Sequence, residues 1–244
     1  MSTMDRNHSL GHSASRSRRA LRATFALVGR PVYHTTLLLL DQETEAAAAV
    51  ADIYRRISTD ELAQYDISTQ EQLLRTAVQV EVKARIKALL SRDPHVFDLP
   101  KGGPRPQPLQ ADDHTTASLL QALPTLYRFL FVLSALWDYD RKELKKLFRL
   151  DDRSLDQALS ALPAMVEGLV RPSSLPWDTY EAFVDHLKGA YADVELPPQL
   201  EECAKSLERE RFAPVARRKI RDAIAYAAII IIVLILAKLG IVHW

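Results

Sequence analysis

The last quarter of the chain contains a stretch that restricts how the protein can fold. Ala223 to Ala237 contains no charged residue, and continuing it through Val242 gives about 20 residues, enough to cross a bilayer core as a helix. We therefore predict a transmembrane helix over residues 222–242, with a buried core helix as the alternative. The most apolar part of this anchor is Ile229, Ile230, Ile231, Ile232 and Leu234.

A basic collar directly precedes the apolar stretch. It consists of Arg217, Arg218, Lys219 and Arg221. Cytoplasmic flanks of membrane spans carry an excess of Lys and Arg. We therefore predict a single-pass protein of the cell membrane that contacts the lipid bilayer and has its N-terminal part in the cytoplasm.

The composition of the rest predicts helices. Only 7 of 244 residues are glycine, and no run of alternating apolar residues is long enough to suggest a sheet. The expected class is all-α. A formal net charge of +1 argues against a surface built entirely for nucleic acid, though not against a local basic patch.

Motifs of catalysis are absent from the sequence. It has no Gly-rich phosphate loop, no His-Glu-x-x-His and no nucleophile elbow, and Cys203 is its only cysteine. Asp138, Asp140, Asp151 and Asp152 could gather a divalent ion, but such acids more often cap helices. We expect no enzyme, no catalytic or metal-binding residues and no cofactor.

The N-terminal part divides into a polar arm and a helical bundle. Residues 1–23 are predicted to be a disordered basic arm, and residues 24–92 three helices. The expected buried faces are Val32, Tyr33, Leu37 and Leu40; Val50, Ile53, Tyr54 and Ile57; and, in a helix from about Thr69, Leu73, Ala77, Val80, Ala84 and Leu89.

A Pro/Gly-rich linker, residues 93–117, leads to a second helical module, residues 118–170. Its first helix has apolar residues at helical spacing: Leu126, Phe129, Leu130, Leu133 and Leu136. A second short helix directs Leu144, Leu147 and Phe148 inward, and the third has Asp152 or Ser154 as its predicted N-cap. Pro163 should kink or stop the third helix near Leu162.

This second module resembles region 4 of the extracytoplasmic-function sigma factors, a helix-turn-helix. The likeness runs from Leu123-Pro124 and Tyr127-Arg128 through Glu143-Leu144 to Ser154-Leu155 and Leu159. Where the family's reading helix has Lys and Arg, this chain has Asp156, Ala158, Ala161 and Pro163. The candidate nucleic-acid contacts that remain are Arg141, Lys142, Lys145, Lys146, Arg149 and Arg153. An ordinary helical hairpin is the alternative.

The bundle of residues 24–92 similarly resembles region 2 of that family. The resemblance rests on Val50-x-Asp52-Ile53-Tyr54 and Arg75-x-Ala77. It implies that Val50, Asp52 and Tyr54 contact RNA polymerase or another partner. The family's clamp-binding acidic and Gln positions are Ala47, Ala48 and Ala51 here, and Gln72 and Val78-Gln79 replace the Trp and the Arg-Asn pair of its promoter-opening helix.

Residues 171–221 are expected to form juxtamembrane helices, one over Thr179 to Tyr191 and an acidic one from about Gln199 to Glu210. They are weakly similar to the corresponding part of membrane-bound anti-sigma proteins.

Two functions follow as hypotheses. The first is a membrane-anchored sigma-factor-like protein that regulates transcription initiation with core RNA polymerase and is freed by cleavage near the basic collar; the substituted positions leave polymerase and promoter-DNA binding open. The second is a decoy, anti-sigma-like protein or scaffold, which uses the sigma fold to bind another sigma or anti-sigma protein without DNA. A tail-anchored adaptor unrelated to transcription is a third.

Overall fold

The structure is a computed structural model that describes residues 3–40, 42–64, 69–99, 116–171 and 176–213. Every regular element in these ranges is helical, which confirms the all-α class. The elements are α1 (Thr3–Leu40), α2 (Glu43–Ser58), the 3-10 helix η1 (Glu61–Gln64), α3 (Gln70–Arg92), α4 (Thr116–Gln121), α5 (Thr125–Phe131), the π-helical segment η2 (Val132–Leu136), α6 (Arg141–Phe148), α7 (Asp152–Val170) and α8 (Tyr180–Ala190). Residues 198–213 are also helical.

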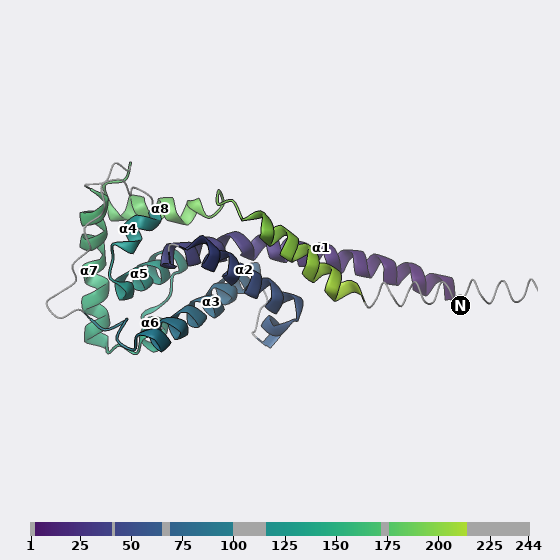
Figure 1. Cartoon of the computed structure of the whole chain (residues 1–244), viewed down its shortest axis with the longest axis horizontal. Helices are drawn as coiled ribbons and strands as arrows, with labels where there is room; N and C mark the ends of the chain where they lie inside the picture. Colours follow the sequence, from purple (N-terminus) through teal and green to yellow (C-terminus); the bar gives the residue numbers. More distant parts are fainter. Residues whose placement is uncertain (1–2, 41, 65–68, 100–115, 172–175, 214–244) are drawn as a thin grey trace, which may run out of the picture.

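Helix α1 runs along the length of the molecule (Figure 1) and packs against α2, α3, α4 and η2. Its buried side chains include Val28, Val32, Leu38 and Leu39, whereas Leu37 and Leu40 are only partly buried. The prediction of a disordered arm over residues 1–23 is corrected, since α1 is helical from Thr3. Burial of Leu21 explains part of this difference, because it fastens the helix to the body before residue 24.

Helix α2 buries the face that the sequence predicted. Val50, Ile53, Tyr54 and Ile57 are all less than 9% exposed. Phe25 of α1 stacks on Tyr54 with 4.4 Å between ring centroids. These contacts join the first two helices through a mixed aliphatic and aromatic core.

Helix α3 begins where the sequence indicated and buries part of the predicted face: Ala77 is fully buried, and Leu73, Val80 and Leu89 pack partly buried against the core. Thr69 caps it, and Thr69 and Gln72 form a reciprocal capping box. The buried residues are Ala77, Val78, Glu81, Val82 and Ile86. Ala84, predicted to be inside, is exposed. The inner face also includes Glu81, whose charge gives no apolar signal in the sequence.

The start of the predicted linker belongs to the core. Phe97 is 5% exposed, and its ring lies 5.2 Å from those of Phe129 and Phe148, centroid to centroid. This aromatic cluster joins the chain after α3 to both α5 and α6. Residues 100–115 of the linker lie outside the described residues.

Two aspartates define the boundaries of α6 and α7. Asp140 caps α6 and accepts from the Glu143 amide at 2.7 Å, and Asp151 caps α7 and accepts from the Ser154 amide at 2.6 Å. The predicted caps Asp152 and Ser154 are therefore replaced by Asp151. Arg149, between the two helices, has φ 55°, a left-handed turn conformation.

Pro163 does not end α7, which continues to Val170. The ring lies on the exposed face, and Leu162, Met165, Val166 and Leu169 are buried on the other. Each such side chain contributes about 1.5–3 kcal/mol on burial, and an internal proline costs about 3 kcal/mol. Burial on both sides of Pro163 therefore favours a continuous helix, and the predicted stop near Leu162 is wrong.

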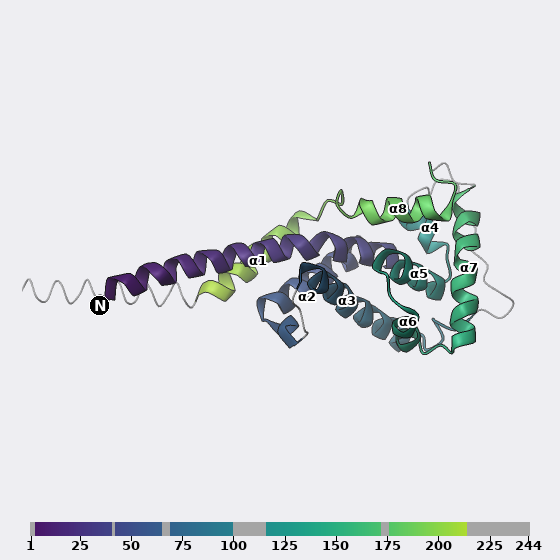
Figure 2. The same cartoon turned by 180° about the vertical axis from the view of Figure 1, so that it is seen from behind.

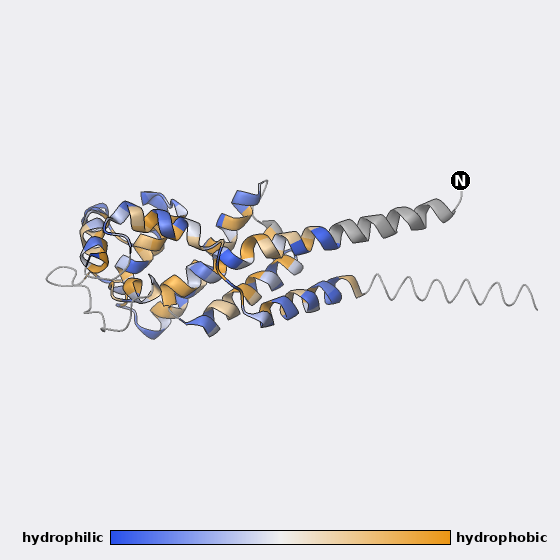
Figure 3. Cartoon of the chain, turned by 90° about the horizontal axis from the view of Figure 1, so that it is seen from above, coloured by the Kyte–Doolittle hydropathy of each residue, from blue (hydrophilic) through white to orange (hydrophobic). Residues whose placement is uncertain are grey.

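The helix at residues 198–213 lies beside α1, as both side views agree (Figures 1 and 2). Arg22 of α1 forms an ion pair with Glu208, with 3.1 Å between Nη2 and Oε1. Arg211 donates to the Ile57 and Ser58 carbonyls at 3.1 and 2.6 Å and pairs with Asp60. Hydrophilic and hydrophobic residues alternate along this helix (Figure 3), whose apolar residues Leu200 and Phe212 are buried.

No helix within the described residues combines the length and hydropathy needed to cross a membrane. The predicted span at 222–242, with Ile229 to Ile232 and Leu234, lies outside them. So does the basic collar of Arg217, Arg218, Lys219 and Arg221. The anchor and its orientation stay predictions.

Gly29 allows α1 and α2 to approach closely, which gives a first test. A Cβ at this position would clash with Tyr54 Oη and lie 3.1 Å from Leu196 Cδ1. We expect Gly29→Ala to lower the free energy of unfolding by about 1–3 kcal/mol. Gly168→Ala in α7 is the matched control, because its Cβ would meet nothing within 4 Å. That change should raise stability by about 0.5–1 kcal/mol. Urea unfolding measures both, and equal effects would contradict the close approach.

His34 makes stability depend on pH. It is 8% exposed, and burial, with a smaller contribution from His186, lowers its pKa from 6.5 to about 4. Between pH 6.5 and about 4, His34 therefore binds a proton in the unfolded chain but not in the folded protein. We expect the free energy of unfolding to be highest, as far as His34 is concerned, above pH 6.5. It should fall by up to about 3 kcal/mol as the pH drops towards 4. Urea unfolding from pH 4.5 to 8 should show a shallower acid loss in His34→Leu; parallel curves would rule the effect out.

Candidate functional site

The predicted nucleic-acid surface lies along α6 and the start of α7, and part of it is neutralised internally. Arg141 forms an ion pair with Asp156, and Lys145 Nζ lies 2.7 Å from Asp152 Oδ2. In both pairs the cation comes from α6 and the acid from α7. Two of the six predicted cations are therefore committed to holding the helices together.

The other four predicted cations are exposed. Lys142 and Lys146 lie on α6, Arg149 in the turn and Arg153 in the first turn of α7. None of them forms an ion pair within the part of the chain that the structure describes. The structure therefore retains a small basic edge beside two internal ion pairs.

Helix α7 lacks the surface of a DNA-reading helix. Ala158 is fully buried, so this position, which the resemblance assigned to DNA reading, faces the core instead. Ala161 is half-buried, Pro163 is exposed and Asp156 pairs with Arg141. Arg153 is the one basic residue of the α7 sequence. The outer face of α7 therefore provides almost no positive charge for binding phosphates.

Arg75 connects the two halves of the described chain. Its Nη2 donates to Glu143 Oε2 at 2.8 Å, and its guanidinium lies 5.3 Å from the centroid of the Tyr139 ring. Glu143 in turn accepts from the Asp140 amide at 3.0 Å as part of the α6 capping box. Arg75, on the helix that carries Gln72 and Val78-Gln79, is thus used to hold α3 against α6.

Tyr139 is enclosed at the same junction. It is 5% exposed, and its hydroxyl has no hydrogen-bond partner among the described residues. Burial raises the pKa of this hydroxyl above its ordinary value, with a smaller contribution from Glu143. The ring therefore stays uncharged beneath Arg75.

The predicted partner contacts on α2 are mostly internal. Val50 is fully buried and Tyr54 is 3% exposed, so these two side chains belong to the core and cannot form a contact surface. Asp52 is the exposed member, with 42% of its side chain accessible. Of the three residues predicted to contact a partner, Asp52 alone has an exposed side chain.

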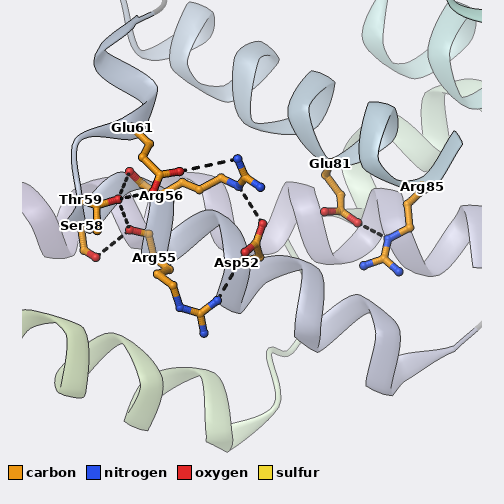
Figure 4. A network of polar contacts seen from close by, with 8 residues as sticks. All are labelled: Asp52, Arg55, Arg56, Ser58, Thr59, Glu61, Glu81 and Arg85. Atoms are coloured by element: carbon orange, nitrogen blue, oxygen red, sulfur yellow. Dashed lines mark hydrogen bonds and ion pairs between the residues drawn. The ribbon is translucent and has the colours of Figure 1, made fainter. Parts of the chain in front are cut away.

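Asp52 lies in a chain of ion pairs along the outer face of α2 (Figure 4). It pairs with Arg56 at 2.8 Å and with Arg55 at 3.4 Å, and Arg56 reaches Glu61 at 3.7 Å. These pairs are exposed and each contributes little to stability. They present alternating charges to solvent, a surface that suits a polar protein contact.

A second charged group lies deeper between α2 and α3. Arg85 pairs with both Glu81 on its own helix and Glu45 on α2. Glu81 is 4% exposed, and burial raises its pKa while Arg85 opposes the shift. Arg85 of α3 is thus an internal partner, while Lys83 and Lys87 of the same helix are exposed.

No group of three or more metal-ligating side chains occurs within the described residues. The four aspartates considered for a divalent ion have other contacts. Asp140 and Asp151 cap helices, while Asp138 and Asp152 pair with Lys188 and Lys145.

The roles of Arg75 and Arg85 in joining helices were missed because Glu143 and Glu45 lie on other helices, far along the chain. Glu143 could have been recognised as a capping residue from its spacing to Asp140. Its ion pair with Arg75 spans 68 positions and has no local signal.

Comparison of the chain with protein-family models, with curated proteins and with solved structures found no match. The likeness to sigma regions 2 and 4 stays a prediction.

The Arg75 contact can be tested through stability. We expect Arg75→Ala to lower the free energy of unfolding by about 1 kcal/mol, because an ion pair and a cation–π contact are both lost. Lys83→Ala is the control, since Lys83 is exposed on the same helix and forms no ion pair within the described residues. It should change stability by less than about 0.5 kcal/mol. Equal unfolding midpoints of Arg75→Ala and the parent protein would refute the contact.

Proposed function

We propose that the protein is a membrane-tethered helical interaction module that acts in transcription regulation through protein partners and does not bind duplex DNA. Its sigma-like body would serve as a decoy, anti-sigma-like protein or scaffold for another sigma or anti-sigma protein. The apolar stretch at 222–242 and the basic collar support the tether.

The pairing of α6 cations with α7 acids carries this proposal. Arg141 and Lys145 are bound to Asp156 and Asp152, as described above. Residues 138–156 contain six basic and six acidic residues, so the segment has no net positive charge. Affinity for DNA depends on cations that displace counterions from the phosphates. An interface with no excess positive charge favours a protein partner.

The contacts of Arg75 and Arg85 add further support. A helix that opens or holds a single strand needs free cations and aromatic side chains along its surface. Arg75 and Arg85 are bound to Glu143, Glu45 and Glu81. The outer face of α2, with Asp52, Arg55 and Arg56, is a candidate docking surface because it is exposed and carries both charges.

A transcriptionally active sigma-like protein is the second candidate. The arrangement of α6, a tight turn at Arg149 and α7 favours it, as does the exposed edge of Lys142 and Lys146. This candidate requires binding of core polymerase and of promoter DNA, so the two proposals predict different results.

Fluorescence anisotropy with a labelled duplex tests the main proposal. We expect the full-length chain in mild detergent to bind no more tightly than about 10⁻⁴–10⁻⁶ M at physiological salt, the range of non-specific association. The double variant Asp152→Asn, Asp156→Asn should bind more tightly, because it frees Arg141 and Lys145, and should steepen the salt dependence by up to about 2 units of log–log slope. The control Asp193→Asn, Glu202→Asn makes the same change in net charge at exposed residues away from this face.

Core polymerase separates the two candidates. Core polymerase is first pulled down with the full-length chain and is then assayed for transcription. We expect no promoter-dependent transcription. Saturable sub-micromolar DNA binding by the parent protein, weakened by Lys142→Ala with Lys146→Ala, would overturn the proposal in favour of an active sigma-like protein. An equal gain in DNA affinity in the variant Asp152→Asn, Asp156→Asn and in its control would show that the α6–α7 pairs do not limit DNA affinity.

A further inference from the structure

A small cavity lies where four helical elements meet. Its volume is about 240 Å³, and it is lined by residues of α1, α3, α8 and the chain that follows η2. The residues that bear on its chemistry are His34, Thr35, Trp137, Asp138, Lys188 and Tyr191. The volume exceeds the roughly 150 Å³ of a cavity known to accept benzene, so an aromatic ring with a small substituent fits.

His34 presents a polar side chain to this cavity. The side chain is more than nine-tenths buried and has no hydrogen bond to any described residue. Its neighbour Thr35 already accepts from the Trp137 indole nitrogen at 3.0 Å. The fully enclosed polar side-chain atoms without a partner among the described residues do not include the His34 ring nitrogens. These nitrogens are therefore accessible, and His34 lines the cavity, so they can bond a molecule held there.

The backbone that forms one wall has an unusual conformation. Residues Val132–Leu136 form a π-helical segment, and Asp138 has φ 49°, in the left-handed region. Non-glycine residues seldom adopt positive φ, and π-helical turns occur frequently at functional sites. This conformation brings Leu136 and Trp137 to the cavity wall.

The lining selects for uncharged ligands. Leu74, Leu136, Leu187 and the rings of Trp137 and Tyr191 are apolar walls. The charged lining residues Asp138 and Lys188 pair with each other at 3.6 Å. Neutral imidazole has one donor and one acceptor nitrogen. It therefore matches a neutral group that can accept or donate a hydrogen bond.

We propose that this cavity binds a small uncharged molecule composed of a flat apolar ring and one hydrogen-bonding group of the carboxamide type, with the ring between the apolar walls and the polar group on His34. Because the cavity is bounded by α1, α3 and α8, binding would stabilise the packing of α8 on the body. This site is separate from the charged surfaces of α2 and α6, so its test does not depend on the proposed function.

The test uses tryptophan fluorescence of the full-length chain in mild detergent. Trp177→Phe with Trp244→Phe leaves Trp137 as the one tryptophan, since the sequence has three, and excitation at the red edge of the tryptophan band avoids the tyrosines. Benzamide is the probe, with toluene, which lacks the polar group, and benzoate, which is charged, as comparisons. We expect a saturable change in Trp137 emission and a rise in unfolding temperature with benzamide up to about 10 mM, a range that covers millimolar affinity. Toluene and benzoate should bind about tenfold more weakly or not at all.

Two variants locate the site. His34→Leu should weaken benzamide binding at least about tenfold, whereas His95→Leu, at an exposed histidine outside the cavity, should leave it unchanged. Leu74→Trp fills the cavity and should abolish benzamide binding while the fold is retained. It replaces His34→Leu in the test if that variant is unstable. The inference is overturned if none of the three probes gives a saturable change, if toluene binds as tightly as benzamide, or if benzamide binds Leu74→Trp and His34→Leu as it binds the parent.

Discussion

The packing of helices along α1 is the contact on which the described structure depends. α2, α3, α4 and η2 all lie against it, and the helix at 198–213 is joined to it by the Arg22–Glu208 ion pair. The close approach at Gly29 and the stacking of Phe25 on Tyr54 hold the first two helices together. Because α1 is shared by elements from both ends of the chain, the buried residues form one continuous core from Leu21 to Phe212.

That shared core changes the interpretation of the charged side chains. Arg75 bridges α3 and α6 by binding Glu143, and Arg85 bridges α3 and α2 by binding Glu45. Arg141 and Lys145 do the same between α6 and α7. A basic residue paired with a carboxylate offers less net positive charge to a phosphate. The same ion pairs that organise the body therefore weaken the case for nucleic-acid binding and favour a protein partner.

The C-terminal helices connect the body to the predicted anchor. Arg211 binds the carbonyls at the end of α2, two residues before the described chain ends at residue 213. The predicted basic collar begins at Arg217. α8 packs on the body through Phe183, which stacks on Phe131 at 5.9 Å between ring centroids. The cavity lined by His34 also borders α8, so the candidate ligand site lies where α8 packs on the body.

The sequence by itself determined the helical class, the buried face of α2, the start of α3 at Thr69 and the inward residues Leu144 and Phe148. These depend on local spacing and capping, which act over three or four residues. Only the tertiary structure decided that α7 continues through Pro163, that Ala158 is buried and that Phe97 joins the core. It also decided the partners of Arg75 and the isolation of His34. Long-range packing energy and ion pairing determine these features, and neither leaves a periodic signal in the sequence.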